Sequence, residues 1–359
     1  MLCLRRLLVA MTLVVVDAAV ATPPRSALRE HIGQANKLGL GLASLGRPGY
    51  INLGHDDDLP AKTVDVMRER AYEVLDAAAA LGITYFDCAR SYGEAEEFAA
   101  SWVASRPEAA AKVTVGSKWG YAYTAGWRTQ VSEGEAHELK ELSLAQLNRQ
   151  LSESLALLPG LRLYQIHSAT MASGVLSDGE VLGALARLRD GTLRPGVSPI
   201  VPGLSVSHPQ VGAIEAAAAL CHGGKPLFGQ VQATFNLLDQ SAAAALAAAH
   251  DAGMVVVVKE ALANGRLTCR APPTPGLAVL RREAEALGVP EDALALAWVM
   301  SHPFVDVCLS GATTVAQLSN NAEALKLLPL APHLMHTLAE ALRQGSDEYW
   351  ADRRALAWN

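Results

Sequence analysis

The sequence of 359 residues predicts an α/β protein with a (β/α)8 TIM barrel. Strand-like and helix-like segments alternate eight times along the chain, which is the pattern of repeated βα units. Several strand-like segments are unbroken apolar runs, such as Val255–Val258, and these suit a parallel sheet that is buried on both faces. Barrels of this class routinely reach this length as one unit. An open doubly wound sheet is the alternative arrangement of the same units.

The first four units are expected between residues 38 and 188. The second strand-like run consists of β-branched and aromatic residues, which favour strands. Gly39-Leu40-Gly41 in the first run lacks the third glycine of a dinucleotide-binding turn, and no helix follows at once, so that motif is rejected. In order, the expected strands and helices are Leu38–Ala43 and Thr63–Leu81, Ile83–Phe86 and Glu94–Ser105, Val113–Ser117 and Ser143–Leu158, and Leu163–Ile166 and Asp178–Leu188.

The last four units are expected between residues 203 and 327. Their helix-like segments are often rich in alanine, but nothing is repeated in a way that would indicate a solenoid. In order, they are Gly203–Ser207 and Gln210–Cys221, Gln230–Ala233 and Ser241–Ala252, Met254–Val258 with the pair Gly276–Leu287 and Glu291–Met300, and Val305–Leu309 and Val315–Leu327.

Polar side chains follow three successive strands. Asp87 and Tyr92 come after the second strand, Lys118 ends the third and His167 ends the fourth. The carboxyl ends of barrel strands meet at one mouth, so these side chains are expected to converge. A lysine beside a tyrosine lowers the pKa of the tyrosine, a carboxylate keeps that lysine charged, and a histidine can orient a carbonyl oxygen. Together they predict a phenol that gives or takes a proton at a carbonyl or alcohol. Taken singly, each residue is also consistent with a purely structural role.

Three motifs that contain these residues, and a fourth motif late in the chain, resemble those of the aldo-keto reductase superfamily. They occur in the order of the βα units, and the resemblance covers roughly residues 36 to 327. It implies an NADP(H)- or NAD(H)-dependent oxidoreductase that acts on a small-molecule carbonyl or alcohol. It also implies Tyr92 as the proton donor or acceptor, tuned by Lys118 and Asp87, with His167 orienting the substrate. The motifs are Tyr85–Gly93, Gly116–Gly120, Tyr164–Ser168 and Leu309–Asn321.

The same resemblance implies a cofactor site along the later strand ends. Ser205 and Gln230 match residues that hold the nicotinamide carboxamide, but the asparagine that usually follows the serine is Val206 here. Lys259 stands where the family has a tyrosine that stacks on the nicotinamide, and an ammonium cannot replace a π-face. Gly311 and Ala312 lie between the last strand and its helix, where backbone N–H groups favour the binding of phosphate. The implied cofactor-binding residues are Ser205, Gln230, Lys259, Leu262, Gly311, Ala312, Thr313, Gln317 and Asn321.

Residues 1–21 read as a signal or targeting segment, with a basic start, an apolar run and an A-x-A site at Ala19–Ala21. We expect routing to the secretory pathway or an organelle, and a cytoplasmic protein if the segment is not used. The apolar run is shorter than the roughly 20 residues that span a bilayer, so no stable membrane span is expected. A linker 22–36, the barrel 37–345 and a tail 346–359 complete the predicted organisation.

The composition limits the kinds of partner. A net charge of −6 gives no electrostatic footprint for nucleic acid. The five cysteines show no metal-binding spacing and no disulfide framework, and no metal site is predicted. The oligomeric state is not indicated.

Two loops are expected to shape the substrate site, Arg47–Pro60 and Trp119–His137. Both contain aromatic residues that suit a small polyol or an apolar carbonyl. The run Asp56–Asp58 is interpreted as a solvated surface. The tail with Trp350 and Trp358 is expected either to cover the mouth or to cap the base. Two alternatives to a carbonyl reductase remain, a sugar (aldose) dehydrogenase and a regulatory subunit that binds the cofactor and turns over slowly.

Overall fold

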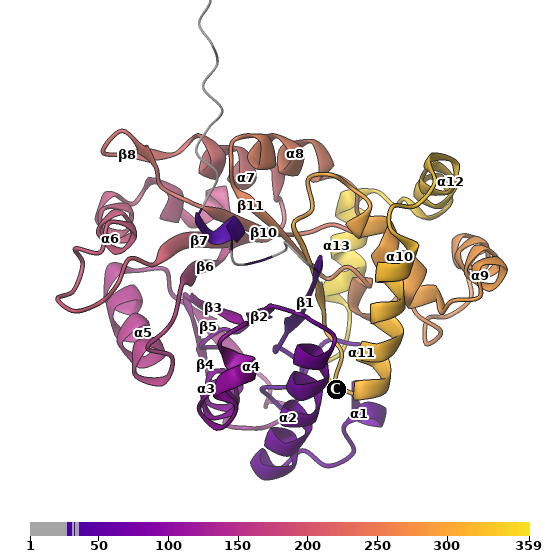
Figure 1. The fold of residues 1–359 in the computed structure, drawn as a ribbon, viewed down its shortest axis with the longest axis horizontal. Helices are drawn as coiled ribbons and strands as arrows, with labels where there is room; N and C mark the ends of the chain where they lie inside the picture. Colours follow the sequence, from indigo (N-terminus) through magenta and orange to yellow (C-terminus); the bar gives the residue numbers. More distant parts are fainter. Residues whose placement is uncertain (1–26, 31, 33–35) are drawn as a thin grey trace, which may run out of the picture.

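The computed structural model describes residues 27–30, 32 and 36–359 (Figure 1). The predicted targeting segment 1–21 lies outside the described residues, as do Cys3 and most of the linker 22–36. The four cysteines within the described residues are free, with Cys88 and Cys308 buried. In this part of the chain, no helix is both long enough and apolar enough to cross a bilayer.

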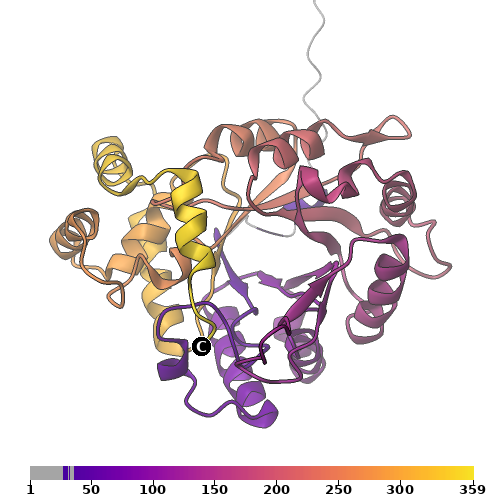
Figure 2. The same cartoon turned by 180° about the vertical axis from the view of Figure 1, so that it is seen from behind.

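Eight parallel strands close into a barrel, which confirms the predicted fold class (Figures 1 and 2). They lie around the barrel in the order in which the chain visits them, because β1 pairs with both β2 and β12. All eight expected strands are present, with their ends shifted by a few residues. They are β1 (Leu38–Gly41), β2 (Tyr85–Asp87), β3 (Thr114–Trp119), β6 (Leu163–Ala169), β7 (Val201–Val206), β10 (Gln230–Thr234), β11 (Val255–Lys259) and β12 (Val307–Ser310).

Helices cover the outside of the barrel, as Figures 1 and 2 show. The side chains of Thr63, Ser143 and Asp178 cap three of them by accepting hydrogen bonds from first-turn N–H groups. The predicted helix Val315–Leu327 ends early, and a 3-10 turn, Glu323–Leu327, follows it. The helices are α1 (His55–Asp58), α2 (Val64–Ala80), α3 (Ala95–Ser105), α4 (Pro107–Ala110), α5 (Leu144–Leu157), α6 (Gly179–Arg189), α7 (Val211–Ala219), α8 (Ala243–Asp251), α9 (Pro275–Leu287), α10 (Glu291–Met300), α11 (Val315–Ala322), α12 (Pro332–Leu342) and α13 (Ser346–Arg354).

Two short hairpins extend from the barrel. One joins β4 (Tyr121–Tyr123) to β5 (Glu138–Lys140) in the loop after β3, and the other joins β8 (Cys221–His222) to β9 (Lys225–Pro226). We define the mouth as the end of the barrel at which the strands have their carboxyl ends. The first hairpin contains part of the predicted substrate loop and lies at this mouth, so it contributes to the site.

The opposite end of the barrel is filled by apolar side chains. Leu28 and Ile32, from the predicted linker, are buried in one cluster with Tyr85, Leu163 and Val255, which lie at the starts of strands. These side chains close the barrel at the end away from the mouth.

Candidate active site

The four predicted catalytic residues meet at the mouth. Asp87, Lys118 and His167 lie near the carboxyl ends of β2, β3 and β6, and Tyr92 reaches them from the loop after β2. Lys118 Nζ forms a buried ion pair with Asp87 and lies 3.3 Å from Tyr92 OH. Tyr92 OH lies 3.5 Å from His167 Nε2. The Tyr92 hydroxyl therefore lies between Lys118 and His167, and Asp87 lies behind the lysine.

The Asp87 carboxylate is held by donors from four strands. Besides the ion pair with Lys118, its Oδ1 accepts hydrogen bonds from Tyr85 OH (3.0 Å), Gln165 Nε2 (3.2 Å) and Gln232 Nε2 (2.9 Å). A buried carboxylate is tolerated only when partners satisfy it, so this network fixes Asp87 and, through it, Lys118. Gln165 and Gln232 are not among the predicted site residues. Their inward position in the period-two alternation of the strands is the signal that could have found them.

The pKa of Tyr92 is raised well above its ordinary value, which corrects the expectation from the sequence. Burial is the largest cause because it disfavours the phenolate, and the charge of Asp87 acts in the same direction. Arg47 lowers this pKa, but its influence is smaller. The charge of Lys118 is balanced by its ion pair with Asp87. Tyr92 is therefore a neutral hydroxyl at neutral pH, which suits a proton donor.

His167 presents its ring nitrogens to two hydroxyl groups. Nδ1 lies 3.4 Å from Ser91 Oγ, while Nε2 faces Tyr92. The ring also packs edge-on against Tyr121, with 4.9 Å between centroids. Burial, and next the charge of Lys118, lower the pKa of His167 well below its ordinary value, so the ring is neutral. If Ser91 donates to Nδ1, the proton of the ring lies on Nε2 and can be donated to a carbonyl oxygen.

Arg47 is a further residue of the site. It was predicted only as the first residue of a substrate loop. Its guanidinium lies 5.2 Å from the centroid of the Tyr92 ring and donates to Ser91 O at 3.0 Å. It also pairs with Glu138 of β5 at 2.9 Å and lies 4.9 Å from the Trp358 ring. Arg47 thus joins the catalytic loop, the hairpin and the tail.

The C-terminal tail lies at the mouth and not at the base. Trp358 stacks on the His137 ring, with 3.9 Å between centroids. Asn359 and Tyr50 exchange two backbone hydrogen bonds of 3.0 Å, and Figure 1 shows the C-terminus close to α1. The tail is therefore attached to both predicted substrate loops, and it covers part of the rim around Tyr92.

The residues implied for the carboxamide are not all placed together. Ser205 is buried near the end of β7, where its Oγ accepts a hydrogen bond from Ser168 N at 2.9 Å. Gln230 is the first residue of β10 and so lies at the end away from the mouth; neither atom of its buried amide has a partner among the described residues. Gln232, two residues on, pairs in register with Ser205. The amide that reaches the mouth is that of Gln232.

The loop between β12 and α11 contains the residues implied for phosphate. A side chain added at Gly311 would meet no atom within 4 Å, so the backbone here faces open space. The N–H groups of Ala312 and Thr313 are already bonded, to Ser310 Oγ at 3.2 Å and to Gln317 Oε1 at 2.9 Å. These two N–H groups would have to break their present hydrogen bonds before they could bind a phosphate.

Gln317 and Asn321 extend this region along α11. Asn321 Nδ2 donates to Ser310 Oγ at 2.8 Å, whereas its buried Oδ1 has no partner among the described residues. Gln317 Nε2 donates to Asp58 Oδ2 at 2.7 Å, and Arg270 holds the same carboxylate with bonds of 2.5 and 2.6 Å. Asp58 is therefore paired, unlike the solvated residue that was expected, and Arg270 is a cation that the sequence does not single out. Leu262 lies in the same loop as Arg270, after β11.

Lys259 ends β11, and Glu260 follows it. Lys259 Nζ lies 2.9 Å from Thr234 Oγ1 and 3.9 Å from Glu260 Oε1. Arg353 of α13 binds the Glu260 carboxylate with both arms of its guanidinium. The centroid of the Trp350 ring lies 5.7 Å from this ammonium. Charged groups thus occupy the place where the family has a stacking tyrosine.

Replacing Arg353 with Met should destabilise the protein at neutral pH and reduce the stability that it loses on acidification. Burial raises the pKa of Glu260, but the charges of Lys259 and Arg353 and the guanidinium hydrogen bonds outweigh it and bring the pKa to about 2. The pKa of a glutamate in the unfolded chain is about 4.3. The pairing of Glu260 with Arg353 therefore stabilises the wild type fully above about pH 4.3, and this contribution is lost as the pH falls toward about 2. The variant should be less stable by about 3 kcal/mol at neutral pH, with a smaller loss on acidification.

Urea unfolding at a series of pH values measures both effects. Arg354→Met is the matched control, since Arg354 is an exposed arginine of the same helix that no hydrogen bond or ion pair joins to another described residue. Parallel stability curves for the wild type and Arg353→Met would contradict the assignment.

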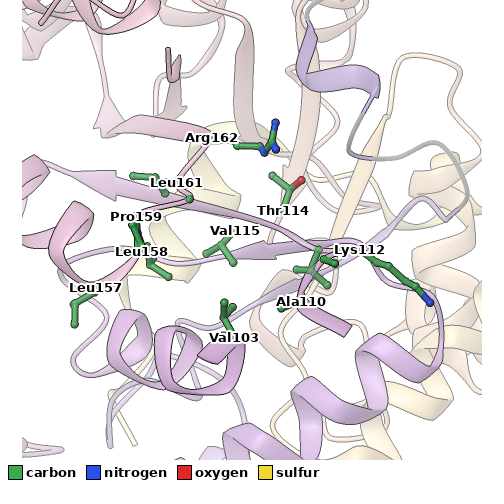
Figure 3. Close-up of a pocket in the computed structure, with 13 residues that line it drawn as sticks. Val103, Ala110, Lys112, Thr114, Val115, Leu157, Leu158, Pro159, Leu161 and Arg162 are labelled. Carbon is green, nitrogen blue, oxygen red and sulfur yellow. The ribbon is translucent and has the colours of Figure 1, made fainter. Parts of the chain in front are cut away.

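Two cavities lie away from the mouth. One, of about 330 Å³, lies beside the start of β3 and the end of α5, with Lys112 and Arg162 at its edge (Figure 3). The other, of about 450 Å³, lies near the starts of β7, β10 and β11. Among the described residues, no group of three or more His, Cys, Asp or Glu side chains could hold a metal ion.

Comparison with known proteins places this site in a familiar fold. The model of the aldo/keto reductase family matches residues 37–343. An aldo-keto reductase of Bacillus halodurans in its holo form is 20% identical, with a TM-score of 0.63 over 87% of this chain and 95% of that chain. A glycerol dehydrogenase of Gluconobacter oxydans is 21% identical, with a TM-score of 0.62 over 86% and 91%. At these identities the structures show the fold alone. No curated protein matches the sequence.

Proposed function

Because the chain belongs to the aldo/keto reductase family and is thus an oxidoreductase, we propose that it reduces small carbonyl compounds with a nicotinamide cofactor. The observation that carries this proposal is the position of Tyr92 OH, 3.3 Å from Lys118 Nζ and 3.5 Å from His167 Nε2. A neutral phenol between an ammonium and a neutral imidazole can protonate an oxygen that binds beside it.

The residues present fit a nicotinamide dinucleotide in several respects. Asn321 Oδ1 is a buried acceptor without a partner, and an adenine amino group would supply the missing donor. The open backbone at Gly311 suits a phosphate. Ser205 Oγ accepts one hydrogen bond and still has its own proton to donate to a carboxamide. When bound, the nicotinamide supplies the hydride.

The side chains of the site stabilise the charge that develops on the carbonyl oxygen and supply its proton. His167 Nε2 and Tyr92 OH lie 3.5 Å apart, close enough for both to donate to one carbonyl oxygen, which they would orient and polarise. As negative charge develops on this oxygen, Tyr92 gives up its proton. Lys118 then stabilises the phenolate, and Asp87 keeps the ammonium in position. The raised pKa of Tyr92 favours this reductive direction at neutral pH.

A panel of aldehydes, ketones and aldoses tests the proposal, with NADPH and NADH each followed by the loss of absorbance of the reduced cofactor. Reduction of at least one class with Tyr92-dependent turnover is expected. Cofactor oxidation that Tyr92→Phe leaves unchanged would refute the assigned chemistry.

A regulatory subunit that turns over slowly is the second candidate, and Lys259 is the observation that favours it. An ammonium at this place offers no π-face for the cofactor, and the nearby Trp350 ring is itself packed and buried. Single-turnover and steady-state measurements distinguish the two. A rapid single turnover followed by slow cycling would support the subunit, while fast cycling would support the reductase.

Gln317→Arg should strengthen NADP(H) binding selectively. Charge-assisted hydrogen bonds to phosphate are roughly twice as strong as neutral ones, and the family often has arginine here. In the wild type, Gln317 is already bonded to Asp58, whose charge Arg270 balances, so only a shallow preference for NADP(H) is expected. The variant should gain about tenfold, or about 1.4 kcal/mol, for NADP(H) in fluorescence titrations. An equal gain for NAD(H) would show that residue 317 does not face the 2′ position.

A further inference from the structure

Lys259 lies on the inward face of β11 at the mouth. Side chains of a strand alternate between two faces, and Val255 and Val257 of β11 belong to the apolar cluster inside the barrel. Lys259 is the next residue on that face, and its side chain is 19% exposed. Its Nζ is therefore directed to the interior of the same mouth that contains Tyr92 and His167.

The surroundings of this amine differ from those of the other lysine of the mouth. Lys118 Nζ is committed to Asp87, to Cys88 O at 3.0 Å and to Tyr92. Within the described part of the chain, Lys259 Nζ has one close hydrogen-bond partner, Thr234 Oγ1. Its acid, Glu260, is 3.9 Å away and is bound more tightly by Arg353. The ammonium of Lys259 is thus only weakly neutralised.

The protonation of Lys259 follows from these neighbours. Burial lowers its pKa most strongly, Glu260 and Asp87 raise it, and the charges of Arg353 and Lys118 lower it, with a net result of about 8. His167, the other titratable group that senses this ammonium, is neutral. A lysine that is desolvated beside other cations is the kind that acts as a nucleophile, because part of it is free amine at neutral pH.

We infer that Lys259 is a second reactive group of the mouth, which captures aldehydes covalently as an imine when no cofactor is bound. The lone pair of Nζ attacks the carbonyl carbon, and the π electrons of the C=O bond pass to oxygen. The two protons of the amine leave with this oxygen as water, and a C=N bond remains. No oxidant or reductant is consumed. This activity shares the carbonyl-binding mouth with the proposed reduction, but it needs neither the hydride nor the nicotinamide.

Reductive trapping tests the inference. The purified full chain is incubated with glyceraldehyde and sodium cyanoborohydride without cofactor, and peptide mass spectrometry reports the adduct on each lysine. We expect Lys259 to be modified at least about tenfold faster than the exposed Lys112, and Lys118 to be spared. Lys259→Arg keeps the positive charge and removes the nucleophile, so the adduct at this site should vanish while the other sites are unchanged. Modification of Lys259 no faster than that of Lys112 would overturn the inference.

The pH profile provides a second measurement. The trapping rate at Lys259 should rise about tenfold per pH unit up to about pH 8 and then level off. Glu260→Gln removes an acid that raises this pKa, so the profile should move to lower pH. A profile that the substitution leaves in place would contradict the role of the free amine.

The outcome is separable from that of the proposed reduction. Tyr92→Phe should abolish most carbonyl reduction and still show the adduct at Lys259. Reduction in the wild type without any adduct would overturn the imine alone, and an adduct without reduction would overturn the reductase alone.

Discussion

Tyr92→Phe is expected to lower the turnover of carbonyl reduction by ~10²–10⁴, the usual contribution of a positioned proton donor. The substitution removes only the hydroxyl that lies between Lys118 and His167, so the ring, its contact with Arg47 and the fold should remain. Steady-state kinetics give the loss, while cofactor titration and circular dichroism should match the wild type.

Tyr123→Phe is the matched control, since it removes a tyrosine hydroxyl from the rim hairpin without touching Lys118 or His167. It should keep turnover within about threefold of the wild type, because substitutions away from critical features rarely exceed ~0.5 kcal/mol. Comparable losses in both variants would show that Tyr92 has no special place in the reaction.

Lys118→Met should destabilise the fold by about 3–5 kcal/mol, because it leaves the Asp87 carboxylate buried without its counter-charge. The side chains of the pair are 0% and 3% exposed, so water cannot take over. Urea unfolding followed by circular dichroism measures the free energy of unfolding. The variant should also lose activity, since no ammonium remains to stabilise the Tyr92 phenolate.

The double variant Lys118→Met with Asp87→Asn is the control for this reading. A neutral amide at position 87 can still bond to Tyr85 and the two glutamines, so the double variant should regain much of the stability. A loss below about 1 kcal/mol in Lys118→Met alone, the value of an exposed pair, would mean that Asp87 is better solvated than its contacts indicate.

The sequence was sufficient to predict the barrel and the meeting of four polar side chains at its mouth, because both depend on local patterns. Apolar runs such as Val255–Val258 specify buried strands wherever they lie, and the topology brings strand ends together at one mouth. Asp87, Lys118 and His167 are therefore juxtaposed by the fold itself. The pKa of Tyr92 was not predictable in this way, because its direction depends on burial and on how the neighbouring charges balance.

Contacts between distant loops could not be predicted. Arg270 and Asp58 are 212 residues apart and meet only because the loops after β11 and β1 lie side by side at the rim. Neither loop has a periodic pattern that fixes its path. The position of Gln230 at the end away from the mouth was missed for another reason. Both side chains face inward, and alternation gives the face of a strand but not the depth along the barrel axis.

The donors around Asp87 also bear on how the barrel is assembled. Lys118 and Gln165 are in the first half of the chain with Asp87, whereas Gln232 is in the second. In a half barrel the ion pair would be exposed to solvent and would stabilise the structure by at most about 1 kcal/mol. It therefore contributes little to the stability of the first half before the barrel closes. Closure of the barrel excludes water from the ion pair and, at the same time, brings the amide of Gln232 to Asp87. The Asp87 carboxylate thus links the two halves of the barrel, and fragments split between β6 and β7 are expected to bury its ion pair only when they associate.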